Sequence, residues 1–255
     1  MNKLSLFGIV FFACTFTGCI NIIEEIFLNK DGSGQYNITM DASAIMEGGG
    51  LRGMMQSLGD QGDNAQMPDL EGPIEMDTTM YFKDAPADFV KDFNHPELLD
   101  KISIHQIISE EKEVMKTVFT LDFEKVNQID QFLKDFSKLS MENQEMAALS
   151  GMMDGIVGGK TLNNVPMYTH AKKMITRAKL ATPEQQEAND ETMQMMKMML
   201  ADASHKLIYH LPGKVKKSNI ANARIEGKDL FVESSFLETM DGKTDLSGWI
   251  KFKGK

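Results

Sequence analysis

Methionine is the residue type in this chain whose number and spacing could do chemistry. The 255-residue sequence contains 21 methionines, and a run of them falls at Met193, Met195, Met196, Met198 and Met199. Thioether sulfur is a soft ligand that binds Cu(I). One interpretation of the run is therefore a Cu(I)-handling protein. On a helix, however, these side chains would point nearly all round the axis, and no histidine or cysteine lies within the run.

Two further interpretations of the same run remain open. Unbranched thioethers adapt to varied partners, so Met193, Met195, Met196 and Met199 could form a surface that contacts lipid, peptide or another hydrophobic partner. The same side chains could instead pack inside the protein, where methionine is common. The copper interpretation has a resemblance in its favour, because the run is similar to the clustered methionines of periplasmic copper proteins.

The histidines do not form a recognisable metal or catalytic pattern. His205 and His210 are five residues apart on a predicted strand, which places them on opposite faces of a sheet. The chain has no H-E-x-x-H motif and no G-x-S-x-G nucleophile elbow. We therefore expect a protein that is not an enzyme and that carries no cofactor.

The first nineteen residues predict export and lipid attachment. Lys3 provides a positive n-region, residues 4–16 form an apolar h-region, and small residues lead into Cys19. This segment resembles the lipobox of bacterial lipoproteins, which implies a diacylglyceryl group on Cys19 and removal of residues 1–18. The alternative is an uncleaved anchor over residues 4–23, which are long enough to span a bilayer. Ile20, rather than Asp, after Cys19 favours the outer membrane.

Charge and cysteine content restrict the remaining possibilities. The formal net charge is −10, and the sequence contains no basic cluster that would meet phosphates, which argues against nucleic acid as a partner. An acidic body also gains nothing from an anionic bilayer, so the lipid on Cys19 would have to hold it there. Because Cys14 lies in the signal and Cys19 would be acylated, the mature domain has neither disulfides nor cysteine metal sites.

The patterning along the chain predicts an α+β protein. Strands are expected at residues 24–28 and 35–40, which would form a hairpin around the Asp-Gly-Ser-Gly turn, and at 75–83, 102–108 and 114–123. Apolar residues at helical spacing predict a helix over 126–139, and further strands form a meander from 205 to 253. We expect one mostly antiparallel sheet, built from the N-terminal hairpin, central strands and C-terminal meander, with helices on one face. Residues 19–255 would form a single envelope domain with a methionine-rich helical insertion at about 140–203.

Segments at the two ends of this domain are similar to the LppM-domain envelope lipoproteins. The first is Leu28-Asn29-Lys30-Asp31-Gly32-Ser33-Gly34. The second is Ile208-Tyr209-His210-Leu211-Pro212-Gly213-Lys214-Val215, and Ile225-Glu226-Gly227-Lys228-Asp229-Leu230-Phe231 follows it. The resemblance implies an α+β, non-enzymatic lipoprotein that touches envelope lipids. The expected function is a membrane-anchored binding or structural module that contacts lipid or a hydrophobic partner.

Overall fold

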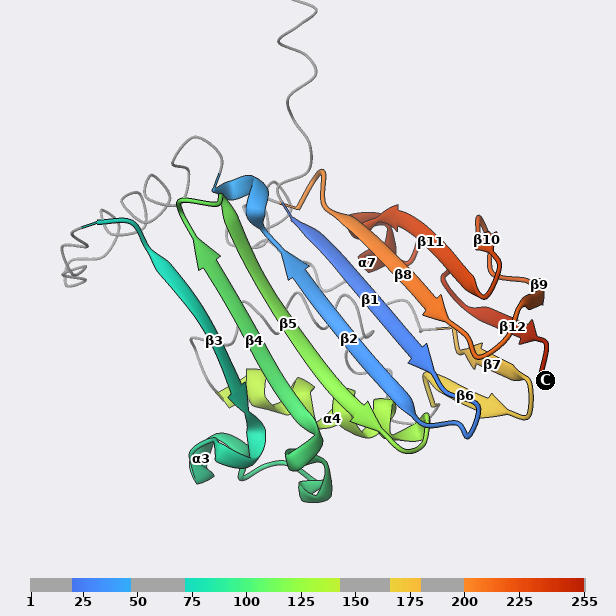
Figure 1. Cartoon of the computed structure of the whole chain (residues 1–255), viewed down its shortest axis with the longest axis horizontal. Coiled ribbons are helices and arrows are strands. Elements are labelled where there is room, and N and C mark those ends of the chain that lie inside the picture. The colour runs from blue at the N-terminus through green and yellow to red at the C-terminus, as the bar shows by residue number, and fades with distance from the viewer. Residues whose placement is uncertain (1–19, 47–71, 143–165, 180–199, 255) are drawn as a thin grey trace, which may run out of the picture.

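The computed structural model describes residues 20–46, 72–142, 166–179 and 200–254. Almost half of these residues lie in the strands of two open sheets (Figure 1). The larger sheet has eight strands in the order β10-β11-β8-β1-β2-β5-β4-β3, and the smaller has four in the order β6-β7-β12-β9. The strands of the larger sheet are β1 (Asn21–Leu28), β2 (Gly34–Asp41), β3 (Glu75–Tyr81), β4 (Ile102–Ser109), β5 (Val114–Phe123), β8 (Ser204–His210), β10 (Arg224–Glu226) and β11 (Asp229–Ser235).

The smaller sheet and the helices account for the remaining elements. The smaller sheet consists of β6 (Tyr168–Ala171), β7 (Met174–Arg177), β9 (Val215–Ser218) and β12 (Gly248–Phe252). The α-helices are α3 (Ala87–Val90), α4 (Asn127–Glu142) and α7 (Phe236–Met240). Short 3-10 turns occur at η1 (Ser43–Ile45), η3 (Phe82–Asp84) and η4 (Pro96–Lys101).

The N-terminal hairpin forms as the sequence predicts. β1 and β2 pair antiparallel, with Leu28 opposite Gly34. In the turn between them Gly32 adopts φ +91°, a conformation that residues with a Cβ rarely take. The Asp31 carboxylate accepts hydrogen bonds from the backbone N–H and the hydroxyl of Ser33, at 3.1 and 2.7 Å, which fixes the turn.

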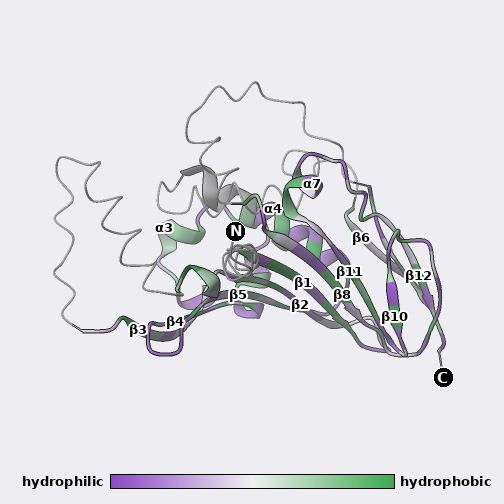
Figure 2. Ribbon diagram, turned by 90° about the horizontal axis from the view of Figure 1, so that it is seen from above, coloured by the Kyte–Doolittle hydropathy of each residue, from purple (hydrophilic) through white to green (hydrophobic). Residues whose placement is uncertain are grey.

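The helices lie on one face of the larger sheet, as expected, and this face is called the inner face below (Figure 2). Helix α4 packs its aromatic residues there: Phe136 meets Phe119 of β5 edge-on at 4.8 Å, and Phe132 meets Tyr36 of β2 at 6.3 Å. All of these rings are buried. The core of the protein therefore lies between the inner face and the helices, and the α+β class is confirmed.

The C-terminal meander differs from the expected single sheet. Strands β8, β10 and β11 join the larger sheet, where β8 pairs parallel with β1, whereas β9 and β12 leave it and pair in the smaller sheet. The partners of β12 there are β9 and β7. Local alternation predicts strands but carries no information about which sheet each one joins.

The predicted helical insertion at about 140–203 is wrong for its middle part. Residues 166–179 form the β6–β7 hairpin, whose turn places Lys172 at φ +54°. Its alternation is concealed in the sequence because Arg177, a charged residue, occupies a buried position beside Ile175. Residues 143–165 and 180–199 lie outside the described ranges. Among the described helices, none is long and apolar enough to cross a membrane.

Candidate functional site

A buried carboxylate lies at the centre of the molecule. On β1 every second residue points to the inner face, and Glu24 occupies such a position between Ile22 and Ile26. All three side chains are 0% exposed. A buried carboxylate is costly unless it is paired and hydrogen-bonded, so its partners determine what this position can do.

Two tyrosine hydroxyls donate to the same oxygen of Glu24. Tyr36 of β2 donates to Oε1 at 2.7 Å, and Tyr168 of β6 donates to it at 2.5 Å. Both tyrosines are fully buried, and burial together with the adjacent Glu24 carboxylate raises the pKa of Tyr36 well above its usual value. Both phenols are therefore neutral donors over the whole physiological pH range.

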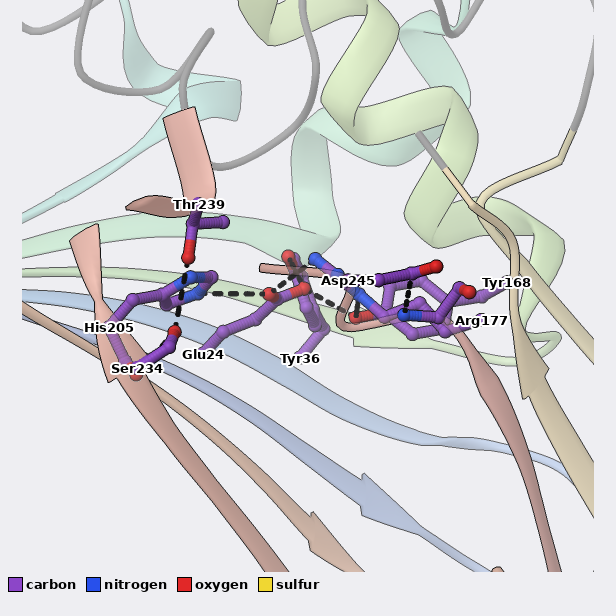
Figure 3. A network of polar contacts seen from close by, with 9 residues as sticks. Glu24, Tyr36, Tyr168, Arg177, His205, Ser234, Thr239 and Asp245 are labelled. Carbon is purple, nitrogen blue, oxygen red and sulfur yellow. Dashed lines mark hydrogen bonds and ion pairs between the residues drawn. The ribbon is translucent and has the colours of Figure 1, made fainter. Parts of the chain in front are cut away.

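Arg177 of β7 neutralises the other oxygen (Figure 3). Its Nη2 donates to Glu24 Oε2 at 3.0 Å, and its Nε donates to the Tyr168 hydroxyl at 3.0 Å. On the far side of Glu24, His205 Nε2 of β8 lies 3.5 Å from Oε2. Burial raises the pKa of Glu24, but Arg177 and His205 outweigh it, and the net effect lowers that pKa to about 2. Burial lowers and Glu24 raises the pKa of Arg177, which ends above its usual value.

The network connects the two sheets and is closed to solvent. Glu24, Tyr36 and His205 belong to the larger sheet, whereas Tyr168 and Arg177 belong to the smaller one. None of the five is more than 3% exposed. A substrate in bulk water cannot reach such a carboxylate, and Glu24, with its pKa near 2, would be a poor base. The arrangement therefore fixes the smaller sheet against the larger one.

Asp130 of α4 makes a second connection to the smaller sheet. Its Oδ1 accepts hydrogen bonds from the backbone N–H groups of Met167 and Tyr168 at 2.7 and 3.3 Å, which holds the start of β6. Its Oδ2 is buried and has no hydrogen-bond partner. Burial, only partly offset by the two backbone donors, raises the pKa of Asp130 to about 6.

His205 and His210 lie on opposite faces of the larger sheet, as the sequence predicts. His205 points to the inner face, while His210 lies on the opposite face, where its ring stacks on Phe27 at 4.2 Å and Nδ1 lies 2.9 Å from Asp229 Oδ1. His95 and His105 each pair with a different aspartate, Asp135 and Asp77. Within the described ranges, no three histidine, cysteine, aspartate or glutamate side chains come together as a metal site would require.

The site residues predicted from the sequence lie outside the described residues. This applies to Cys19 and to Met193, Met195, Met196 and Met199. Lipid attachment and the three interpretations of the methionine run therefore stay predictions.

Sequence reasoning did not single out the Glu24 network, although one signal was available. In residues 22–28 the alternate positions hold Ile22, Glu24, Ile26 and Leu28, so a carboxylate stands in the apolar register of a strand. A charged residue at such a position needs a buried partner. The partner Arg177 is 153 residues away, and no local pattern connects the two.

Comparison with known proteins gives one distant structural likeness. No protein-family model matches the chain, and no curated protein matches it. Among solved structures, the chain is similar to the folded domain of the LppM protein of Mycobacterium tuberculosis, determined by NMR. The match covers 93% of this chain and 92% of the other, with 10% sequence identity and a TM-score of 0.41.

Proposed function

We propose that the protein is a lipid-anchored, non-enzymatic module of the cell envelope that contacts lipid or a hydrophobic partner at the end of the larger sheet nearest Cys19. Support for the anchor comes from the segment that resembles a lipobox. Support for a non-enzymatic role comes from the Glu24 network, whose acidic, basic and phenolic groups are buried and engaged with one another. Ile20 after Cys19 favours the outer membrane as the location.

The strand register identifies which end of the sheet lies near the anchor. Asn21, the first residue of β1, lies opposite Asp41 of β2, and Asp41 lies opposite Lys116 of β5. Cys19 precedes Asn21 by two residues, which span roughly 7 Å when fully extended. An acyl group on Cys19 would therefore keep this end, here called the anchor end, close to the bilayer.

An apolar row crosses the inner face at the anchor end and is the observation that carries the proposal. Met76 of β3 lies opposite Ile108 of β4, which lies opposite Met115 of β5, the residue next to Lys116. Met76 is 37% exposed, and Ile108 and Met115 are half-buried. Three adjacent apolar side chains in this position suit an acyl chain or the apolar surface of a partner.

Lipid attachment can be tested by mass. The protein isolated from membranes should lack residues 1–18 and carry the mass of a diacylglyceryl group on Cys19, whereas the Cys19→Ala variant should keep its full length and carry no lipid. An unmodified full-length wild-type chain would contradict the lipoprotein and favour the uncleaved anchor. Fractionation of the same membranes tests the outer-membrane location.

The apolar contact can be tested by native mass spectrometry after mild extraction without delipidation. We expect the wild-type protein to retain a non-covalent hydrophobic molecule and the Ile108→Ser/Met115→Ser variant to lose it. The matched control is Ile107→Ser/Val118→Ser, which removes two apolar side chains from the opposite face of the same strands. A wild-type protein without such a molecule, or equal loss in both variants, would contradict the contact.

A further inference from the structure

The smaller sheet carries an excess of positive charge in a protein whose net charge is −10. The segments 166–179, 212–219 and 246–254, which form its four strands and the residues next to them, contain no aspartate or glutamate. They carry Lys179, which pairs with Asp245 at 3.3 Å, and seven further exposed lysines: Lys172, Lys173, Lys214, Lys216, Lys217, Lys251 and Lys253. None of the seven forms an ion pair with any residue that the structure describes, in contrast to Lys101, Lys116 and Lys206 of the larger sheet and its turns. This basic face was not apparent in the sequence.

Strand pairing brings these lysines together at a cost. Lys217 of β9 lies directly opposite Lys251 of β12, and like charges in that relation destabilise a sheet. The backbone N–H of Phe252 donates to the carbonyl of Lys173, and that of Lys253 donates to the carbonyl of Lys214. These bonds bring the three lysine-bearing segments together at one corner of the smaller sheet. Lys172 adopts φ +54°, where glycine or asparagine fits with less strain.

An open depression adjoins this corner. Its volume is about 610 Å³, and it is lined by Gly213, Lys214, Lys228, Lys253 and other residues of the neighbouring turns. The two carboxylates in its lining already have cationic or histidine partners: Glu226 pairs with Arg224, and Asp229 with His210. The three lysines in the lining have no such partner among the described residues. An anion entering the depression would therefore meet positive charge that is not yet neutralised.

An aromatic side chain lies among the lysines. Trp249 is two residues from Lys251 on β12, so the two share a face, and the Lys251 ammonium lies 5.0 Å from the centre of the indole ring. Met174 of β7 lies opposite Lys251 on the other side, and Thr176 lies opposite Trp249. The face thus combines spaced cations with a half-buried indole, which can pack against the apolar side of a sugar ring.

We propose that this basic face binds a polyanionic glycan, a polysaccharide that carries repeated carboxylate or phosphate groups. Phe27, near the last residue of β1, lies opposite His210, and the chain reaches Lys214 four residues later. The basic corner therefore lies at the end of β1 remote from Asn21, roughly 20–25 Å from the anchor end at about 3.3 Å per residue. The choice of a glycan over the bilayer and over nucleic acid rests on the anchored, envelope location proposed above. The positive charge of the face does not depend on that location.

Trp249 provides a direct readout because it is the only tryptophan in the chain. The full-length Cys19→Ser chain is titrated with polygalacturonate and with neutral dextran while its fluorescence is followed. We expect the fluorescence to change with polygalacturonate and not with dextran, and the affinity for polygalacturonate to fall as salt is raised. The Lys173→Glu/Lys217→Glu variant should bind polygalacturonate at least tenfold more weakly. The slope of log affinity against log salt should decrease by about 1–2 in that variant.

The matched control is Lys112→Glu/Lys125→Glu, which changes net charge equally at exposed positions outside the basic face. Equal weakening by both pairs of substitutions would mean that only net charge matters and would overturn the proposal. So would the absence of a polyanion effect, or tighter binding to anionic vesicles or to duplex DNA than to polygalacturonate. Circular dichroism shows whether each variant folds. If charge reversal prevents folding, the Lys217→Gln variant, which only removes the charge, provides a milder test.

The two proposals fail in distinguishable ways. If Cys19 proves to be unacylated but polygalacturonate binds, the envelope anchor is wrong and the basic face keeps its anion-binding role. If Cys19 is acylated and no polyanion binds, only the glycan proposal is overturned.

Discussion

The two sheets treat charge in opposite ways. In the larger sheet the central charge, Glu24, is completely buried and receives two tyrosine hydroxyls and one guanidinium. In the smaller sheet the only buried cation, Arg177, serves that same carboxylate, and the seven lysines remain exposed without partners among the described residues. The larger sheet thus uses charge to hold the fold together, whereas the smaller sheet carries charge that its own stability does not need.

This difference separates a stabilising role from a binding role. Groups that satisfy one another inside the protein have little capacity left for a ligand, and breaking such a buried pair is costly. Lysines that repel one another on a surface reduce stability, but they are available to an anion. Substitutions in the buried network should therefore lower stability, whereas substitutions of the exposed lysines should not, and four predictions follow, beginning with the largest effect.

Loss of Arg177 should destabilise the protein most. The Arg177→Met variant leaves the Glu24 carboxylate buried with hydrogen bonds but without its guanidinium, and we expect a loss of about 3–5 kcal/mol in the free energy of unfolding. Urea denaturation measures it. The control, Lys206→Met, breaks the exposed pair with Glu233 and should cost less than about 1 kcal/mol. Similar values for the two variants would show that the buried pair does not hold the sheets together.

The pH dependence of stability should reveal two buried carboxyl groups that act in opposite directions. The pKa of Glu24 is lowered to about 2, so its contribution is present above its ordinary value of 4.5 and is lost as pH falls toward 2. The pKa of Asp130 is raised from 3.8 to about 6, so the folded state loses stability as pH rises from about 4 through 6.

The Asp130→Asn variant isolates the second effect. An amide cannot ionise, and its oxygen can still accept from the N–H groups of Met167 and Tyr168, so the decline between pH 4 and 6 should disappear. At roughly 1.4 kcal/mol per pKa unit, the gain at pH 7 is at most about 3 kcal/mol. Urea denaturation at pH 4, 5, 6 and 7 checks it, with the exposed Asp122→Asn variant as control. A decline that persists unchanged in Asp130→Asn would refute this assignment.

Gly213 should be intolerant of a side chain because of close backbone approach. A Cβ at this position would lie only 1.7 Å from the carbonyl oxygen of Lys253, the residue that follows β12. We expect Gly213→Ala to cost about 1–3 kcal/mol, the usual range for overpacking. At Gly254 an added Cβ meets only the flexible side chain of Lys173, so Gly254→Ala should lower the melting temperature less. Equal melting temperatures for the two variants would exclude close approach as the cause.

The smallest effect should be a gain in stability. Lys217→Glu replaces a repulsive cross-strand pair with an attractive one opposite Lys251, and it should stabilise the protein by about 0.2–1 kcal/mol. The same variant should bind polygalacturonate more weakly. Lys216→Glu, which changes charge equally without facing Lys251, should gain less stability. A Lys217→Glu protein that is both less stable and equally able to bind would contradict the contrast between the sheets.

Local patterns determined much of the fold. Alternation in residues 35–40 and 114–123 predicted β2 and β5, helical spacing over 126–139 predicted α4, and Asp31-Gly32-Ser33 predicted the hairpin turn. These elements follow from the sequence because neighbouring residues decide them: side-chain period, turn chemistry and φ preference all act over a few positions. The α+β class then follows from the order of the elements.

Tertiary structure decided the features that depend on residues far apart in the chain. Glu24 and Arg177 meet across 153 positions, and β9 and β12 separate from the rest of the meander because β12 pairs with β7. The basic face arises in the same way, from lysines in three separate segments of an acidic chain. The sequence alone determined the lipobox-like segment, the methionine run and the strands themselves. Pairing between distant strands decided which charges are buried and which are presented to solvent, because strand pairing sets the neighbours of each side chain.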